Sequence, residues 1–141
     1  MNEESRKLAA MLLKHEGLRL KPYVCPAGKL TIGVGRNIED MGISEEEAIY
    51  MLENDIHRVR IECSKAFTWF QKLSPVRQDV VISMVFNLGM PKFLEFRAMI
   101  AAIQKGEYDR AASEMLNSKW AAQTGRRAVE LAQMMRSGEY A

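Results

Sequence analysis

The residue pattern changes once along this chain, and that change limits the folds the chain can adopt. Between residues 18 and 34, β-branched and aromatic side chains surround Cys25-Pro26-Ala27-Gly28, where Pro and Gly occupy positions favoured in a type I turn. This segment predicts a β-hairpin, and residues 37–42 after it predict a polar linker. The rest of the chain carries helical patterns. We therefore expect an α+β protein that is mostly helical.

Helix signals lie on both sides of the predicted hairpin. Residues 5–16 place apolar side chains at helical spacing, and Gly17 follows as a natural C-terminal cap. Ser44 and Glu47 form an S-x-x-E capping box, which opens a long helix reaching about residue 67. Further helices are expected up to the C-terminus, separated by Ser74-Pro75, Gly89-Met90-Pro91, Gly106 and Gly138.

The length of 141 residues suits a single domain spanning residues 1–141. We expect a small N-terminal lobe over about residues 14–60, which carries the hairpin. A helical lobe is expected over about residues 61–141, together with the N-terminal helix, and the long helix would join the lobes beside a cleft. No stretch approaches the roughly 20 apolar residues of a membrane span, and no signal peptide is recognisable, so we expect a soluble protein.

Cysteine and histidine are too sparse for a disulfide framework or a metal site. The chain has Cys25 and Cys63, which form no CxxC or Cys/His pair with metal-ligand spacing, and His15 and His57 stand apart. We expect no metal and no cofactor.

Charge is unevenly distributed, although the net charge is only +2. Residues 1–36 and 97–141 carry more Lys and Arg than Asp and Glu, whereas residues 37–96 carry more acidic residues. Basic ends that meet in space would make a mildly positive cleft for an anionic polymer, either a nucleic acid or the bacterial cell wall. Scattered, solvated charge is the alternative explanation.

Three chemically useful groups lie in or next to the predicted hairpin. Glu16 ends the predicted first helix, where the negative end of the helix dipole disfavours a charged carboxylate and so suits a proton donor. Cys25 begins the turn near lysines that favour a thiolate, and Thr31 begins an alternating strand. Each residue alone also fits an ordinary structural role. Together they resemble what glycosidic hydrolysis needs, one acid for the leaving oxygen and a second group that activates water or stabilises the cation.

The same residues carry a resemblance to a known family. The run Glu16-Gly17-Leu18-Arg19-Leu20-Lys21, then Tyr23, then Thr31-Ile32-Gly33-Val34-Gly35 resembles the phage-type lysozymes of glycoside hydrolase family 24, especially the T-even phage branch. The spacing of Glu16, Cys25 and Thr31 also fits that family. Similar stretches follow in the same order: Met84-Val85-Phe86-Asn87-Leu88-Gly89, Ser118-Lys119-Trp120, Gln123-Thr124, Arg127 and Arg136-Ser137-Gly138.

The resemblance implies a two-lobed lysozyme-like fold and an endo-acting muramidase. Such an enzyme cuts the β-1,4 bond between N-acetylmuramic acid and N-acetylglucosamine in peptidoglycan. By the same resemblance, Glu16 is the general acid, Cys25 stands in place of the catalytic Asp, and Thr31 helps to hold the attacking water. The substrate-binding residues implied in the helical lobe are Asn87, Thr124 and Arg127.

Two features depart from or extend the family pattern. The small lobe is much shorter between Arg36 and Ser44 than in the T-even branch, so contacts to sugar or peptide made there are expected to be lost or replaced. Asp55 falls among apolar positions of the long helix, where an unpaired carboxylate is costly. The resemblance pairs it with Arg36, which would tether the hairpin to the long helix.

The resemblance also implies partners and a location. We expect a monomer that acts on peptidoglycan glycan strands, waits in the host cytoplasm, and reaches the periplasmic side of the wall after a separate holin-like protein permeabilises the membrane. The alternative function is a catalytically weak, glycan-binding module of a phage particle. A nucleic-acid binder using Arg126-Arg127 is not expected, because aromatic interleaving and a clustered basic face are missing.

Overall fold

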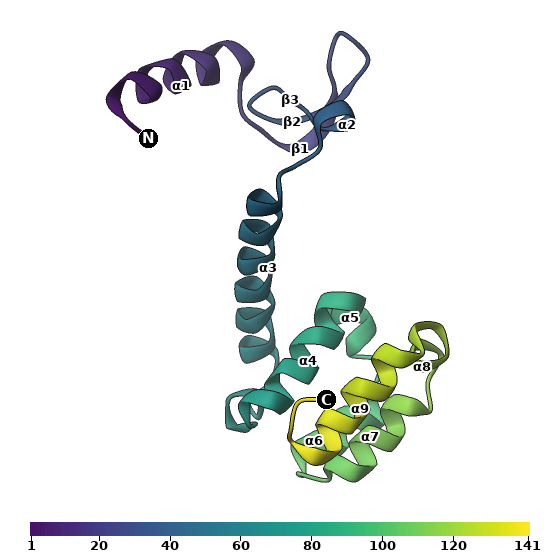
Figure 1. Cartoon of the computed structure of the whole chain (residues 1–141). Helices are drawn as coiled ribbons and strands as arrows, with labels where there is room; N and C mark the ends of the chain where they lie inside the picture. The colour runs from purple at the N-terminus through teal and green to yellow at the C-terminus, as the bar shows by residue number, and fades with distance from the viewer. The chain divides into compact units, whose positions relative to one another are not determined.

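A computed structural model describes all 141 residues of the chain (Figure 1). The chain divides into two compact units, Met1–Tyr50 and Met51–Ala141. The first unit contains all of the β-structure, and the second is helical throughout. The expected α+β fold with mostly helical content is confirmed. No helix combines the length and the apolar character that crossing a membrane would require.

The first helix, α1 (Glu3–Glu16), has both of its ends fixed by caps. The side chain of Asn2 accepts a hydrogen bond from the backbone N–H of Ser5 at 2.8 Å, so the helix begins before residue 5. At the other end, the N–H of Gly17 donates to the carbonyl of Leu13 at 2.9 Å. The predicted C-terminal end of this helix is confirmed, and Glu16 is its last residue.

The sheet has three antiparallel strands in the order β1-β2-β3. The strands are β1 (Arg19–Val24), β2 (Leu30–Gly33) and β3 (Arg36–Asn37). Between β1 and β2, the N–H of Gly28 donates to the carbonyl of Cys25 at 2.8 Å, which closes a four-residue turn. The predicted hairpin is therefore confirmed.

The predicted linker over residues 37–42 is wrong. This segment contains the end of β3 and a short helix, α2 (Ile38–Met41). Asn37 pairs with Thr31 in the sheet, and its side chain accepts from the N–H of Asp40 at 3.1 Å as the N-cap of α2. A two-residue strand and a one-turn helix are too short to show any period in the sequence.

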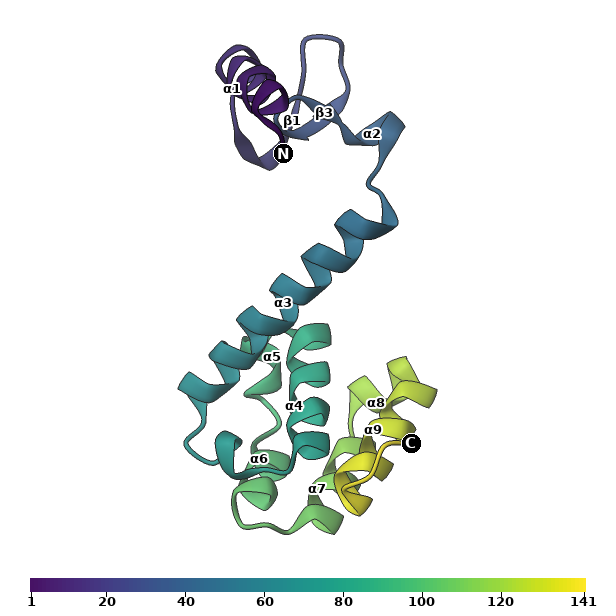
Figure 2. The same ribbon diagram turned by 60° about the vertical axis from the view of Figure 1, so that its left-hand side comes forward.

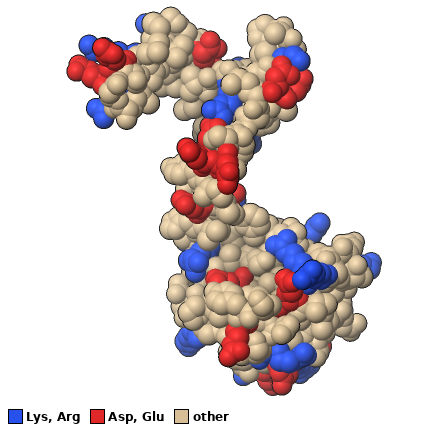
Figure 3. All heavy atoms as spheres, in the orientation of Figure 1, with Lys and Arg blue, Asp and Glu red and all other residues tan.

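The longest helix, α3 (Glu45–Ala66), opens with the predicted capping box. The N–H of Glu47 donates to the hydroxyl of Ser44 at 3.1 Å, and the N–H of Ser44 donates to the carboxylate of Glu47 at 2.9 Å. Figure 3 shows acidic side chains gathered where this helix begins. Carboxylates at this end stabilise a helix because its dipole is positive there.

The second unit packs the end of α3 with the remaining helices around one apolar core. These helices are the 3-10 helix η1 (Phe70–Lys72), α4 (Pro75–Leu88), α5 (Met90–Phe93), α6 (Arg97–Gln104), α7 (Tyr108–Leu116), α8 (Lys119–Thr124) and α9 (Arg126–Ser137). The helix α7 packs between α6 and α9, and α9 also packs against α4 (Figure 2). The predicted breaks are confirmed, because Ser74 caps α4 and glycines follow α4, α6 and α9.

A row of aromatic contacts runs through this core. Phe67 lies 4.5 Å from Trp69 and 5.7 Å from Phe93, measured between ring centroids. Phe93 lies 6.5 Å from Phe96, which meets Trp120 edge-on at 6.2 Å. Aromatic pairs at such distances stabilise the fold by more than the burial of their surface alone would. The row fixes Trp120, and with it the start of α8.

Candidate functional site

Glu16 lies at the junction of α1 and the sheet. Its carboxylate is exposed and lies beside the backbone of Gly35, in the turn between β2 and β3. The helix cap holds the backbone here, since Gly17 donates to Leu13 directly after Glu16. An acid on a fixed backbone and open to solvent can meet a substrate oxygen without rearrangement of the fold.

Cys25 and Thr31 are held together by the end of the hairpin. The N–H of Cys25 donates to the carbonyl of Lys29 at 2.9 Å, and the hydroxyl of Thr31 donates to the same carbonyl at 2.9 Å. Cys25 is half-buried, whereas Thr31 is only 3% exposed. One backbone carbonyl therefore fixes the positions of both residues.

This environment favours the ionised form of Cys25. A backbone hydrogen bond from Lys29 lowers the pKa of the thiol, the Thr31 side chain lowers the pKa further, and burial opposes them. Thr31 has one hydroxyl proton, so the thiolate competes with the Lys29 carbonyl for it. The hydroxyl oxygen of Thr31 also has lone pairs, so it is an acceptor as well as a donor.

The two residues predicted to form a structural pair each have a nearby partner. Arg36, on β3, pairs with Glu47 at 2.5 Å, which joins the sheet to the first turn of α3. The pKa of Glu47 is lowered to about 2, first by the Arg36 hydrogen bond and then by Ser44. Asp55 pairs with Arg58, one turn along its own helix, at 2.7 Å. The Arg36–Asp55 pair stays a prediction, since its members belong to different units.

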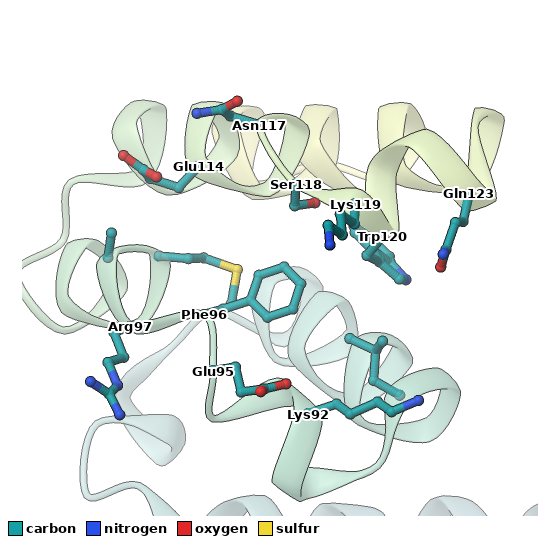
Figure 4. Close-up of a pocket in the computed structure, with 13 residues that line it drawn as sticks. Lys92, Glu95, Phe96, Arg97, Glu114, Asn117, Ser118, Lys119, Trp120 and Gln123 are labelled. Atoms are coloured by element: carbon teal, nitrogen blue, oxygen red, sulfur yellow. The ribbon is translucent and has the colours of Figure 1, made fainter.

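The second unit carries a groove of about 460 Å³ between the α5–α6 bend and the start of α8 (Figure 4). Phe96 and Trp120 point toward each other across it. Charged and amide side chains surround this aromatic pair, namely Lys92, Glu95, Arg97, Glu114, Asn117, Lys119 and Gln123. An aromatic floor with a polar rim suits a ligand that presents both apolar faces and hydrogen-bonding groups, as sugars do.

Two of the predicted binding residues are anchored to Trp120. The indole N–H of Trp120, a residue only 5% exposed, donates to Oδ1 of Asn87 at 2.8 Å. The hydroxyl of Thr124 donates to the backbone carbonyl of Trp120 at 3.0 Å. Because its oxygen accepts from the indole, Asn87 has its side-chain NH₂ group to offer as a donor.

The third predicted binding residue lies at a different groove. Arg127 donates through one terminal nitrogen to the carbonyl and to the hydroxyl of Ser83, both at 3.1 Å. It lines a mainly apolar groove of about 370 Å³ with α4 and α3 residues, including Ile56 and Phe86. Asn87 and Thr124 thus share one anchor, and Arg127 has another.

Comparison with known protein families shows which family the chain belongs to. The family model described as phage lysozyme matches residues 13–137. The chain belongs to the phage lysozyme family. The matched range takes in both units and every predicted site residue, from Glu16 to Arg127.

Individual relatives agree with this assignment. An endolysin of Acyrthosiphon pisum secondary endosymbiont phage 1 is 33% identical over 120 residues, which cover 82% of this chain and 78% of the relative. Probable T4-type lysozyme 1 of Dictyostelium discoideum is 26% identical over 157 aligned positions, 91% of this chain and 92% of the relative. The pre-baseplate central spike protein Gp5 of Enterobacteria phage T4 is 27% identical over 93% of this chain, but only 28% of Gp5 is matched. This phage lysozyme is therefore a glycoside hydrolase of the peptidoglycan-degrading type.

Sequence reasoning missed much of the groove rim of this phage lysozyme. Lys92, Glu95 and Arg97 come from α5, the bend after it and α6, and they approach α8 only through tertiary packing. The available signal was Phe93 and Phe96, two aromatic residues three apart with charged residues around them. Such a pair indicates a buried turn, but it does not indicate which helix lies opposite.

Proposed function

We propose that this phage lysozyme cleaves the β-1,4 bond between N-acetylmuramic acid and N-acetylglucosamine, with Glu16 as the general acid. The observation that carries the proposal is the position of Glu16, an exposed carboxylate on the capped end of α1 and next to the sheet that carries Cys25 and Thr31. General acid catalysis requires a carboxyl group within hydrogen-bond reach of the leaving oxygen. The family match gives the reaction class.

In this mechanism Cys25 and Thr31 serve the attacking water. Thr31 accepts a hydrogen bond from the water, and the Cys25 thiolate takes a proton from it. The water oxygen bonds to the anomeric carbon as the glycosidic C–O bond breaks, and the leaving oxygen receives the proton of Glu16. The lowered pKa of Cys25 supports the base role, because it raises the thiolate fraction near neutral pH.

Replacing the thiol separates this role from a covalent one. Cys25→Asp restores a carboxylate and is expected to keep lysis, whereas Cys25→Ala is expected to lose nearly all of it. Intact-protein mass spectrometry during turnover is expected to find no glycan adduct on Cys25. An adduct there would replace water activation by a covalent route, which needs a separation of about 5–5.5 Å between the two catalytic groups rather than about 6.5–9.5 Å.

Substrate binding is assigned to Asn87, Thr124 and Arg127, together with the groove in Figure 4. Asn87 bonds to the indole of Trp120 and Thr124 bonds to its backbone carbonyl, so both residues lie next to a residue that lines this groove. The rim charges of both signs suit glycan strands that carry peptide and carboxylate groups.

The biological setting proposed here is that of an endolysin. The enzyme is proposed to be a monomer that stays in the host cytoplasm until a separate holin-like protein permeabilises the membrane. It then acts on the cell wall in the periplasm. The endolysin relative supports this proposal.

The decisive variant is Glu16→Gln, since the amide is nearly isosteric but delivers no proton. Lysis of permeabilised Gram-negative cells, followed by turbidity, is expected to slow by about 100- to 10,000-fold. Its control is Glu4→Gln, which changes an exposed acid in the first turn of the same helix and is expected to stay within twofold of wild type. Activity of Glu16→Gln within tenfold of wild type would remove Glu16 from the mechanism.

A further inference from the structure

The turn between β2 and β3 brings Gly35 unusually close to the Glu16 carboxylate. A Cβ atom built on Gly35 would lie 2.8 Å from Oε2 of Glu16, 3.1 Å from its Cδ and 3.2 Å from its Cγ. Real Cβ atoms are essentially never found closer than 3.0 Å to such atoms. The carboxylate therefore occupies space that only glycine leaves open.

Backbone conformation does not explain this contact, as Gly33 at the end of β2 shows. Gly33 has a φ of +72° and Gly35 a φ of +66°, so both adopt the left-handed region that favours glycine. A Cβ built on Gly33, however, meets nothing within 4 Å. The two positions share the backbone requirement and differ in the neighbouring carboxylate.

We propose that Gly35 is a positioning residue for Glu16, because its missing side chain keeps the carboxylate beside the β2–β3 turn. The inference rests on the proposed role of Glu16 as general acid. With any side chain at position 35, Oε2 would have to move by at least 0.6 Å to reach an ordinary contact of 3.4 Å. The backbone of Glu16 is fixed by the cap of α1, so the side chain must rotate instead.

Such a movement affects catalysis more than folding. Glu16 is exposed, so its flexible end can give way with little loss of stability. A general acid, in contrast, must stay within hydrogen-bond reach of the glycosidic oxygen, and a misplacement of about 1 Å in an active site can cost about 100-fold in rate. A substitution at Gly35 should therefore lower kcat and leave KM nearly unchanged.

The experiment compares Gly35→Ala with Gly33→Ala as a matched control. Both variants place Ala at positive φ, so both are expected to lose similar stability in urea unfolding. On soluble peptidoglycan fragments, Gly35→Ala is expected to lower kcat about 10- to 100-fold with KM within twofold. Gly33→Ala is expected to keep kcat within twofold of wild type. Gly35→Asn and Gly33→Asn repeat the comparison with a residue that accepts positive φ more readily, in case the Ala variants fold poorly.

Glu16→Gln, assayed in parallel, separates the two claims. If Glu16→Gln is inactive and the Gly35 variants match their Gly33 controls in kcat, the positioning role is wrong and the proposed acid stands. If Glu16→Gln keeps its activity, the proposed acid is wrong and the positioning role falls with it. Loss of kcat in the Gly35 variants alone, beside an inactive Glu16→Gln, supports both.

Discussion

Replacing Arg77 by Ala should destabilise the second unit more than any change at an exposed arginine. Nε of Arg77 donates to the carbonyl of Met135 at 2.8 Å, and one terminal nitrogen donates to the carbonyl of Arg136 at 3.0 Å. The guanidinium also lies 3.7 Å over the ring centroid of Tyr108. One half-buried side chain on α4 thus holds the last turn of α9 and the first residue of α7.

The size of the effect follows from these three contacts. Each hydrogen bond contributes about 1 kcal/mol, with more expected from a charged donor, and the cation–π contact adds about 0.5–1 kcal/mol. The variant should lose about 2–4 kcal/mol of unfolding free energy. With an unfolding entropy of about 0.3 kcal/mol/K for a chain of this length, Tm should fall by about 7–13 °C.

Urea unfolding followed by circular dichroism measures this loss. Arg77→Lys keeps the charge but not the planar fork, so it should recover only part of the stability. Arg110→Ala is the matched control, because Arg110 is exposed on the same unit and pairs with Glu107 at 3.7 Å. Arg110→Ala should lower the unfolding free energy by less than about 1 kcal/mol. A loss at Arg77→Ala below about 0.5 kcal/mol would refute the anchoring role.

Three further outcomes are expected. Alkylation at pH 8 should modify Cys25 and stop lysis while leaving Cys63 unmodified, since burial raises the pKa of Cys63 to about 11; rapid modification of Cys63 would contradict its burial. Because the folded pKa of Glu47 is about 2 against an ordinary 4.5, the stability it provides is present above pH 4.5 and lost as pH falls toward 2. In the Glu47→Gln variant, the unfolding free energy should change less between pH 4.5 and pH 2 than in the wild type. If the two proteins lose stability equally over this range, the Arg36–Glu47 ion pair is not the source of the loss. Asn87→Ala should lower the unfolding free energy by about 1–3 kcal/mol. In a double-mutant cycle, its effect should be coupled to that of Trp120→Phe, because the two side chains share a hydrogen bond. Strictly additive losses of stability would exclude that hydrogen bond.

Features that depend on neighbours in sequence were predictable. The Gly17 cap, the turn that ends at Gly28 and the Ser44–Glu47 capping box each need only a few consecutive residues, and all three form. Their hydrogen bonds close within three or four residues, so the residue types decide them before the chain folds. The candidate catalytic residues Glu16, Cys25 and Thr31 also lie in one short stretch, but their roles come from the family resemblance and stay a prediction.

Features that depend on distant residues were not predictable. The contact between Arg36 and Glu47 was not foreseen, since the sequence does not say which residue of a following helix meets a strand end, and the Arg36–Asp55 pair stays a prediction. The rim of the groove is assembled from α5, α6, α7 and α8, so no local pattern marks Lys92 or Glu114 as part of it. The close approach of Gly35 to Glu16 likewise exists only after the sheet has folded against the end of α1.

The central claim is that this phage lysozyme cuts the glycan backbone at the muramic acid side of the bond. Analysis of the new reducing ends after digestion of purified peptidoglycan tests it most directly. Borohydride reduction of the digest should yield muramitol derivatives from the wild-type enzyme and none above background from Glu16→Gln. Glucosaminitol as the reduced product, or soluble fragments without any new reducing end, would contradict the account.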